Sequence, residues 1–182
     1  MKNVVILLGS PRKNGNSATL AKQAEDGILS VGGTVETFYL NGMNIRPCQG
    51  CEHCRRRPEE GCAIRDDMQR IYPALKEAYA VLIASPIYMF SVTAQTKLFL
   101  DRCYAVSQSF AGKRIGILLS YGDVDEFESG AVNAIFSLRD EYRYKKAKIV
   151  GIVHGSADAI GEIASNQRVM EDAFQLGKTL VD

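Results

Sequence analysis

The sequence predicts an α/β fold in which a five-stranded parallel sheet lies between two layers of helices. Five short apolar runs rich in β-branched residues recur along the 182 residues, and helical patterns alternate with them. Strands joined in this way require right-handed crossovers and a parallel sheet covered on both faces. Because this length suits one such domain, we expect residues 1–182 to form a single unit.

The first half of the chain supplies two strands and an irregular insert. Residues 3–8 are uninterruptedly apolar after Asn3, which suits a strand buried on both faces. A helix capped by Ser17 is expected over residues 17–29. Residues 34–40 alternate in polarity, as an outer strand does. The insert at residues 41–65 contains four of the five cysteines.

The second half continues the alternation, with Pro86 closing the third strand. Its expected elements are a helix from Asp66 or Asp67 to Ala78, a strand at 80–85, a helix at 93–104, a strand at 114–120, a helix at 126–142, a strand at 148–154 and a helix at 165–180. Five strands in one doubly wound domain favour the flavodoxin-like order 2-1-3-4-5, a three-layer sandwich. Ligands of such sheets bind beyond the carboxyl ends of the strands.

Composition and charge exclude several functional classes. The residues are 46% hydrophobic and 24% charged, with a net charge of +1, so nothing favours binding to nucleic acid or to an anionic membrane surface. No apolar run approaches the roughly 20 residues of a transmembrane helix. The apolar run 4–8 is too short for the core of a signal peptide, so we expect a cytoplasmic protein.

The loop after the first strand predicts a phosphate site. It places hydroxyls, amides and cations directly before a helix, where free backbone N–H groups and the helix dipole favour an anion. The candidate residues are Ser10, Arg12, Asn14, Asn16 and Ser17. The loop matches neither the dinucleotide-binding nor the Walker glycine pattern. The alternative is an ordinary polar turn, since turns use the same residue types.

Two further loops at the same edge suggest what carries the phosphate. Residues 85–91 are apolar and aromatic where a surface loop is expected to be polar, so they need a partner. A flavin ring is one such partner, and a neighbouring subunit is another. The candidates here are Pro86, Ile87, Tyr88, Met89, Phe90 and Ser91. In the third loop, Ser120, Tyr121 and Gly122 are placed to close over the ring.

These loops together resemble the NAD(P)H-dependent FMN reductase group of flavodoxin-like proteins. The matching residues are Gly9-Ser10-Pro11-Arg12, Asn16-Ser17, Ser85-Pro86-Ile87-Tyr88, Ser91, Gln95, Lys97 and Asp101-Arg102. With its cysteines, Gly61 and Asp66-Asp67, the chain is similar to the iron-sulfur flavoprotein branch. The resemblance implies that the first loop holds the FMN phosphate and the second the flavin ring. Met89 departs from it, because an aromatic residue is frequent at this position.

The cysteines Cys48, Cys51, Cys54 and Cys62 follow the pattern C-x2-C-x2-C-x7-C. One irregular loop with this spacing can place four thiolates around a 4Fe-4S cluster. A zinc site takes the same ligands, but its cysteine pairs usually stand farther apart. Bare thiols are the third alternative. The fifth cysteine, Cys103, is expected to be a small buried apolar residue.

The expected function is that of an FMN-dependent oxidoreductase linking two-electron and one-electron carriers. Its chemistry takes place on the cofactor, so no side chain need act as a catalytic acid or base. Expected partners are NAD(P)H as a transient substrate and a small molecule or ferredoxin-like carrier, within a homodimer or homotetramer. The alternatives are a cluster-free NAD(P)H-dependent reductase of flavins, quinones or nitro compounds, and a flavodoxin-like electron carrier without NAD(P)H activity.

Overall fold

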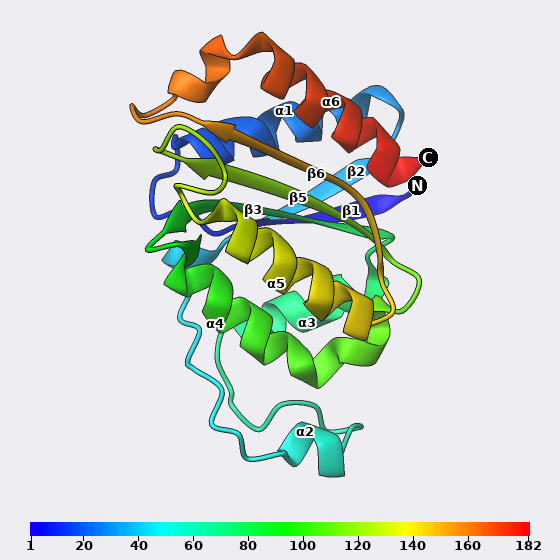
Figure 1. Ribbon diagram of the computed structural model, residues 1–182. Helices are drawn as coiled ribbons and strands as arrows, with labels where there is room; N and C mark the ends of the chain where they lie inside the picture. The colour runs from blue at the N-terminus through cyan, green and yellow to red at the C-terminus, as the bar shows by residue number, and fades with distance from the viewer.

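The six strands form one sheet in the computed structural model, which describes residues 1–182 (Figure 1). They are β1 (Asn3–Leu8), β2 (Thr34–Tyr39), β3 (Ala80–Tyr88), β4 (Ser91–Val92), β5 (Arg114–Tyr121) and β6 (Lys148–Ser156). The order is β2-β1-β3-β5-β6, and the short β4 pairs with β3. The five long strands are parallel. The predicted sheet and its 2-1-3-4-5 order are therefore confirmed.

Helices cover both faces of this sheet (Figure 1). One face carries α1 (Asn16–Ser30) and α6 (Gln167–Val181), and the other carries α3 (Met68–Glu77), α4 (Ala94–Arg102) and α5 (Ala131–Tyr144). β1 alternates between the two cores, since Val5 and Leu7 join a cluster of 25 buried residues and Val4 and Ile6 join one of 16. This two-sided burial explains why the strand is uninterruptedly apolar.

The third strand is longer than predicted, because Pro86 does not end it. β3 runs on to Tyr88 and turns into β4, so that Ile87 pairs with Val92 and Tyr88 with Ser91. A proline is tolerated at this place because the main parallel ladder of β3 also ends there, with Pro86 opposite Ser120. The predicted loop over residues 85–91 is thus largely a short β-hairpin.

Several helix boundaries also differ from prediction. The N-cap of α1 is Gly15 rather than Ser17. α5 begins at Ala131, five residues late, because the Asp125 carboxylate accepts the N–H groups of Phe127 and Glu128 and holds them in a turn. The helices at the end of the chain are η3 (Glu162–Ser165) and α6, with Asn166 as N-cap. α4 stops at Arg102 and continues as the 3-10 helix η2 (Cys103–Phe110).

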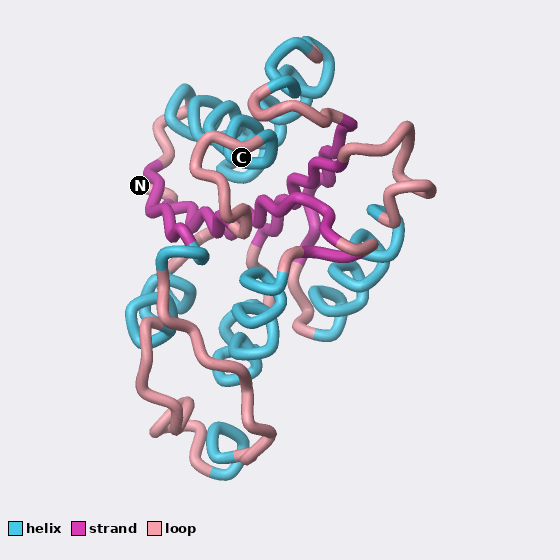
Figure 2. Tube along the Cα trace, turned by 90° about the vertical axis from the view of Figure 1, so that its left-hand side faces the viewer, coloured by secondary structure: helices cyan, strands magenta, loops and turns pink.

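The cysteine insert extends away from the sheet, beyond the layer of α3 and α4 (Figures 1 and 2). It begins with η1 (Leu40–Gly42) and contains one short helix, α2 (His53–Arg56). Cys103 is fully buried as expected, and burial raises the pKa of its thiol to about 12. None of the helices combines the length and apolar character that crossing a bilayer requires.

Candidate functional site

Four loops meet around a pocket of about 220 Å³ at the carboxyl edge of the sheet. Three of them are the predicted loops, and the fourth follows β6. The lining residues are Ser10, Arg12, Gly15, Asn16, Ser17, Pro86, Ile87, Tyr88, Ser120, Tyr121, Gly122, Ala157, Asp158 and Ile160. Ten of the fourteen predicted cofactor residues are among them. Asn14, Met89, Phe90 and Ser91 lie outside this lining.

The loop after β1 presents an anion-binding helix terminus to the pocket. No side chain caps α1, so the N–H groups of its first turn have no side-chain partner from the cap residue. Because Ser17 lies inside the helix instead of capping it, its hydroxyl is free for a ligand in the pocket. Ser10 is also buried, and its hydroxyl accepts the N–H of Arg12 at 3.0 Å. Together with the helix dipole, these groups favour a phosphate.

The Asn16 side chain has a different role from the one predicted. Its amide nitrogen donates to the carbonyl oxygens of Ala157 and Ala159 at 3.1 and 3.0 Å. Its amide oxygen accepts the N–H of Ile163 at 3.3 Å. These bonds commit the side chain to holding the loop after β6 against the start of α1. Asn16 therefore shapes the pocket, and only its backbone N–H remains for a ligand.

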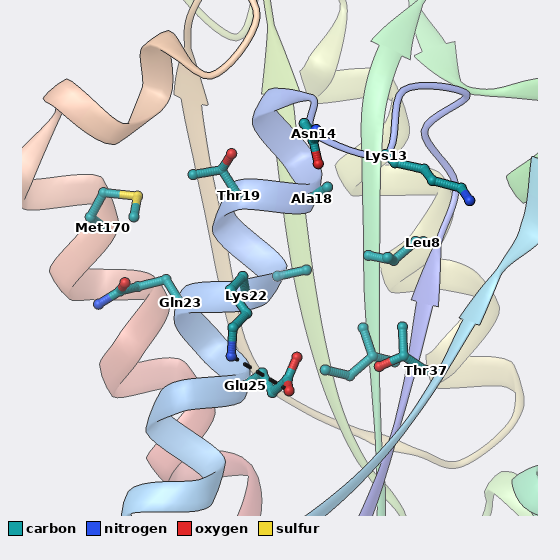
Figure 3. Close-up of a pocket in the computed structure, with 12 residues that line it drawn as sticks. Leu8, Lys13, Asn14, Ala18, Thr19, Lys22, Gln23, Glu25, Thr37 and Met170 are labelled. Carbon is teal, nitrogen blue, oxygen red and sulfur yellow. Dashed lines mark ion pairs between the residues drawn. The ribbon is translucent and has the colours of Figure 1, made fainter.

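A second pocket, of about 460 Å³, lies along α1 and contains Asn14 (Figure 3). Its polar side chains do not converge, since Lys22 pairs with Glu25 and Lys13 points away in the close-up. Although this pocket is larger, its lining draws on one loop, on α1 and α6, and on the faces of β1 and β2. The smaller pocket is lined by residues at the carboxyl ends of four strands, where ligands of such sheets bind. It is therefore the better candidate for the functional site.

Buried hydroxyls join the first two loops beneath the pocket. Thr93, the N-cap of α4, donates to the Gly9 carbonyl at 2.7 Å and contacts the Thr96 hydroxyl at 2.9 Å. Thr96 in turn lies 3.3 Å from the Ser85 hydroxyl. All three hydroxyl residues are fully buried. This network fixes the loop after β1 relative to the end of β3, an arrangement that sequence reasoning missed.

The β3–β4 hairpin forms one wall of the site. Pro86, Ile87 and Tyr88 line the pocket, whereas Met89 and Phe90 form the turn and are 88% and 57% exposed. Both turn residues have positive φ, 47° and 63°, where Asn and Gly are usual. The turn thus combines backbone strain with large exposed apolar side chains.

The remaining wall combines a predicted loop with one that was missed. Ser120, Tyr121 and Gly122 follow β5 as expected, and Ala157, Asp158 and Ile160 follow β6. The rule that ligands bind at carboxyl strand ends applies to β6 as well, so this signal was available in the sequence. Tyr121 is buried, which raises the pKa of its phenol, and its hydroxyl lies 3.1 Å from His154 Nδ1. His154 therefore contacts a residue that lines the pocket.

The four cysteines of the insert lie outside this pocket, on the projecting loop. Cys48 and Cys51 are exposed, and Cys54 and Cys62 are half-buried. Burial raises the pKa of the Cys54 thiol, and the charges of Cys62, Cys48 and Cys51 add to the effect. No three side chains of the usual ligand types converge as a single metal ion requires. A cubane cluster binds each thiolate through a different iron, so its ligands need not converge on one point.

Comparison with known proteins agrees with this geometry. Residues 1–159 match the family model described as NADPH-dependent FMN reductase. An iron-sulfur flavoprotein of Archaeoglobus fulgidus is 36% identical over 181 residues, which cover 97% of this chain and 77% of the relative.

Solved structures share the fold at lower identity. An NAD(P)H:quinone oxidoreductase from Methanothermobacter marburgensis is 19% identical, with a TM-score of 0.75. The match covers 100% of this chain and 98% of the oxidoreductase chain. An FMN-dependent NADH-azoreductase from Bacillus anthracis, solved with FMN, is 12% identical with a TM-score of 0.71 and covers both chains fully. The protein is a flavin-dependent oxidoreductase. The chain belongs to the NADPH-dependent FMN reductase family.

Proposed function

We propose that the pocket at the carboxyl edge binds FMN and that the cysteine insert carries a 4Fe-4S cluster. The observation that carries the flavin proposal is the meeting of an uncapped helix terminus with an apolar hairpin in one pocket. The first feature suits a phosphate and the second a planar ring. When bound, FMN would supply two-electron chemistry on its ring and the cluster one-electron exchange.

The residues of this chain would bind and orient the cofactor. The hydroxyls of Ser10 and Ser17 and the first-turn N–H groups of α1 would hold the phosphate, and the side chain of Arg12 would offset its charge. Pro86 to Tyr88 would contact the edge and face of the ring, with Ser120 to Gly122 opposite. Met89, Phe90 and Ser91 would extend this wall toward a second subunit.

The four thiolates of Cys48, Cys51, Cys54 and Cys62 would hold the cluster. The compact spacing of these cysteines favours a cluster over a single zinc ion, whose cysteine pairs usually stand farther apart. Arg102 at the end of α4 anchors the base of the insert, and Thr93 at the start of the same helix donates to Gly9 in the loop after β1, so one helix connects the two proposed sites.

This arrangement would let the protein link NAD(P)H or another two-electron partner to a ferredoxin-like carrier. Residues 1–182 would form one flavin-binding domain and would act in the cytoplasm, where thiols stay reduced. The exposed Met89 and Phe90 would be covered in a homodimer or homotetramer.

The flavin site is tested by titrating the protein with FMN and, separately, with riboflavin. The Ser17→Ala variant should bind FMN about tenfold more weakly, as loss of a charge-assisted hydrogen bond implies, with little change for riboflavin. Ser30→Ala, at the far end of the same helix, is the control. Equal binding of both ligands by the unaltered protein would place the phosphate elsewhere.

The cluster is tested by an anaerobic visible spectrum with iron and acid-labile sulfide analysis. Cys54→Ser should lose both elements and keep FMN, whereas Cys103→Ala, at the buried fifth cysteine, should keep the wild-type content. A protein without iron or sulfide whose flavin is still bleached by NAD(P)H would be the cluster-free reductase. One that does not oxidise NAD(P)H but exchanges electrons with ferredoxin would be the simple carrier.

A further inference from the structure

Arg102, the last residue of α4, holds the two ends of the cysteine insert together. Its guanidinium donates to the Arg46 carbonyl at 2.7 Å and to the Ile64 carbonyl at 3.3 Å. It also forms a bidentate pair with the Asp66 carboxylate, at 2.6 and 3.1 Å. Both charged side chains are completely buried. One cation thus binds two chain segments that are 18 residues apart and bracket all four cysteines.

Asp66 completes this closure from the other side. Its carboxylate accepts the N–H of Arg46 at 2.9 Å and the N–H of Met68 at 3.0 Å. Next to it, the Asp67 carboxylate accepts the N–H of Asn44 at 2.7 Å. The base of the insert is therefore held by charged hydrogen bonds rather than by a β-ladder.

The closure is close in sequence to the first and the last of the four cysteines. The Arg46 and Ile64 carbonyls are two residues from Cys48 and Cys62 respectively. Tyr72 donates its hydroxyl hydrogen to the Arg102 carbonyl at 3.2 Å, and Cys62 packs against the buried cluster that contains Tyr72. Arg102 Nε is buried without a partner. A desolvated cation with an unused donor thus lies at the base of the segment that carries the cysteines.

We infer that Arg102 and Asp66 are positioning residues that set the geometry and the local charge of the cysteine site. A buried ion pair of this kind is weak evidence for a contribution to stability alone, because desolvation offsets its attraction. Charge and hydrogen bonding near a cluster do control its reduction potential. The inference rests on the proposed cluster, and the test is chosen to separate the two.

The charge role is tested by measuring the reduction potential and the EPR spectrum of the anaerobic full-length protein. Arg102→Met should lower the cluster potential, because it removes a positive charge and leaves Asp66. Asp66→Asn should raise it, because it leaves Arg102 uncompensated. The double variant should return toward the wild-type value. If Arg102 and Asp66 acted only on the structure, both single substitutions would shift the reduction potential in the same direction. That result would overturn the charge assignment.

The positioning role is tested by amide hydrogen exchange across residues 47–63, a measurement that does not need the cluster. Arg102→Met should speed exchange at least about tenfold, as breaking a buried pair implies, while Arg102→Lys should be intermediate. Arg143→Met, at an exposed arginine, is the control and should not change it. Unchanged exchange in both Arg102 variants would refute the closure. If the wild-type protein holds no cluster, the cluster proposal fails while this measurement still decides the positioning role.

Discussion

At the scale of single residues, Gly9 shows how tightly the loop after β1 packs on α4. A Cβ atom built at this position would lie 1.9 Å from the Thr96 hydroxyl oxygen and 3.2 Å from that of Thr93. These hydroxyls belong to the buried network that joins the loop to β3. Only glycine allows this approach, so the residue is required by packing rather than by its backbone angles.

We therefore expect Gly9→Ala to weaken FMN binding and to lower the free energy of unfolding by about 1–3 kcal/mol, the usual cost of overpacking. FMN titration and urea unfolding measure the two effects. Thr96→Ala removes the nearest clashing atom, so Gly9→Ala should cost less in that background. Additive losses in this double-mutant cycle would show that the clash is not the cause.

The buried carboxylate of Asp66 makes a second prediction at this scale. Burial by itself would raise its pKa, but hydrogen bonds from Arg102 and from two backbone N–H groups hold the pKa below the ordinary value of 3.8. A pKa that is lower in the folded than in the unfolded state stabilises the fold above the unfolded value, and this stabilisation disappears as the pH falls through the folded value.

The free energy of unfolding should thus decrease as the pH falls below about 4. Asp66→Asn should remove part of this pH dependence. Urea unfolding between pH 2.5 and 6 measures it. Asp140→Asn, at an exposed carboxylate that pairs with Arg143, provides the comparison and should leave the curve unchanged. If the free energy of unfolding of both variants depends on pH as it does in the wild-type protein, the Asp66 pair does not contribute to that dependence.

At the scale of elements, α1 and α6 pack through two glycines on the face of the sheet that carries them. A Cβ at Gly27 would lie 2.1 Å from the Phe174 carbonyl oxygen, and one at Gly177 would lie 2.0 Å from that of Ala24. Because these neighbours are backbone atoms, neither helix can yield by rotating a side chain.

Either Gly27→Ala or Gly177→Ala should therefore separate the helices, although alanine has the better helix propensity. We expect a loss of at least about 1–3 kcal/mol in the free energy of unfolding, measured by urea. Leu29→Ala, at a half-exposed position of α1, should cost less. A stabilised Gly27→Ala variant would mean that propensity outweighs the contact.

At the scale of the whole molecule, the β3–β4 turn combines strain and exposure in a way that a monomer does not require. Asn and Gly adopt the positive φ of Met89 and Phe90 with less strain. The double variant Met89→Asn, Phe90→Gly should leave the chain folded with an equal or higher melting temperature and dissociate the proposed oligomer. Analytical ultracentrifugation of both proteins measures the assembly.

Val124→Ser is the matched control, because Val124 is 86% exposed in the neighbouring loop after β5. It should not change the sedimentation of the protein. If the turn variant sediments like the wild-type protein, the exposed side chains serve another purpose, such as covering the flavin ring.

Local patterns predicted most of the framework and most of the pocket. The apolar runs indicated strands that are buried on both faces of a parallel sheet. Because parallel strands end at the same edge, the predicted loops had to lie together there, and ten of the predicted residues do line the pocket. Element boundaries were less certain. Pro86 and Ser17 were assigned the ordinary roles of their residue types, as a strand end and a helix cap, and the structure gives them other positions.

The sequence by itself determined the alternation of strands and helices, the polar loop directly before the first helix, and the spacing of the four cysteines, because each depends on neighbours in the chain. The tertiary structure alone decided that Asn16 holds the loop after β6, that Thr93 joins two loops, and that Arg102 closes the insert. These contacts join residues 141, 84 and 56 positions apart. No local periodicity records such pairs, because they exist only once the strands have brought their ends together.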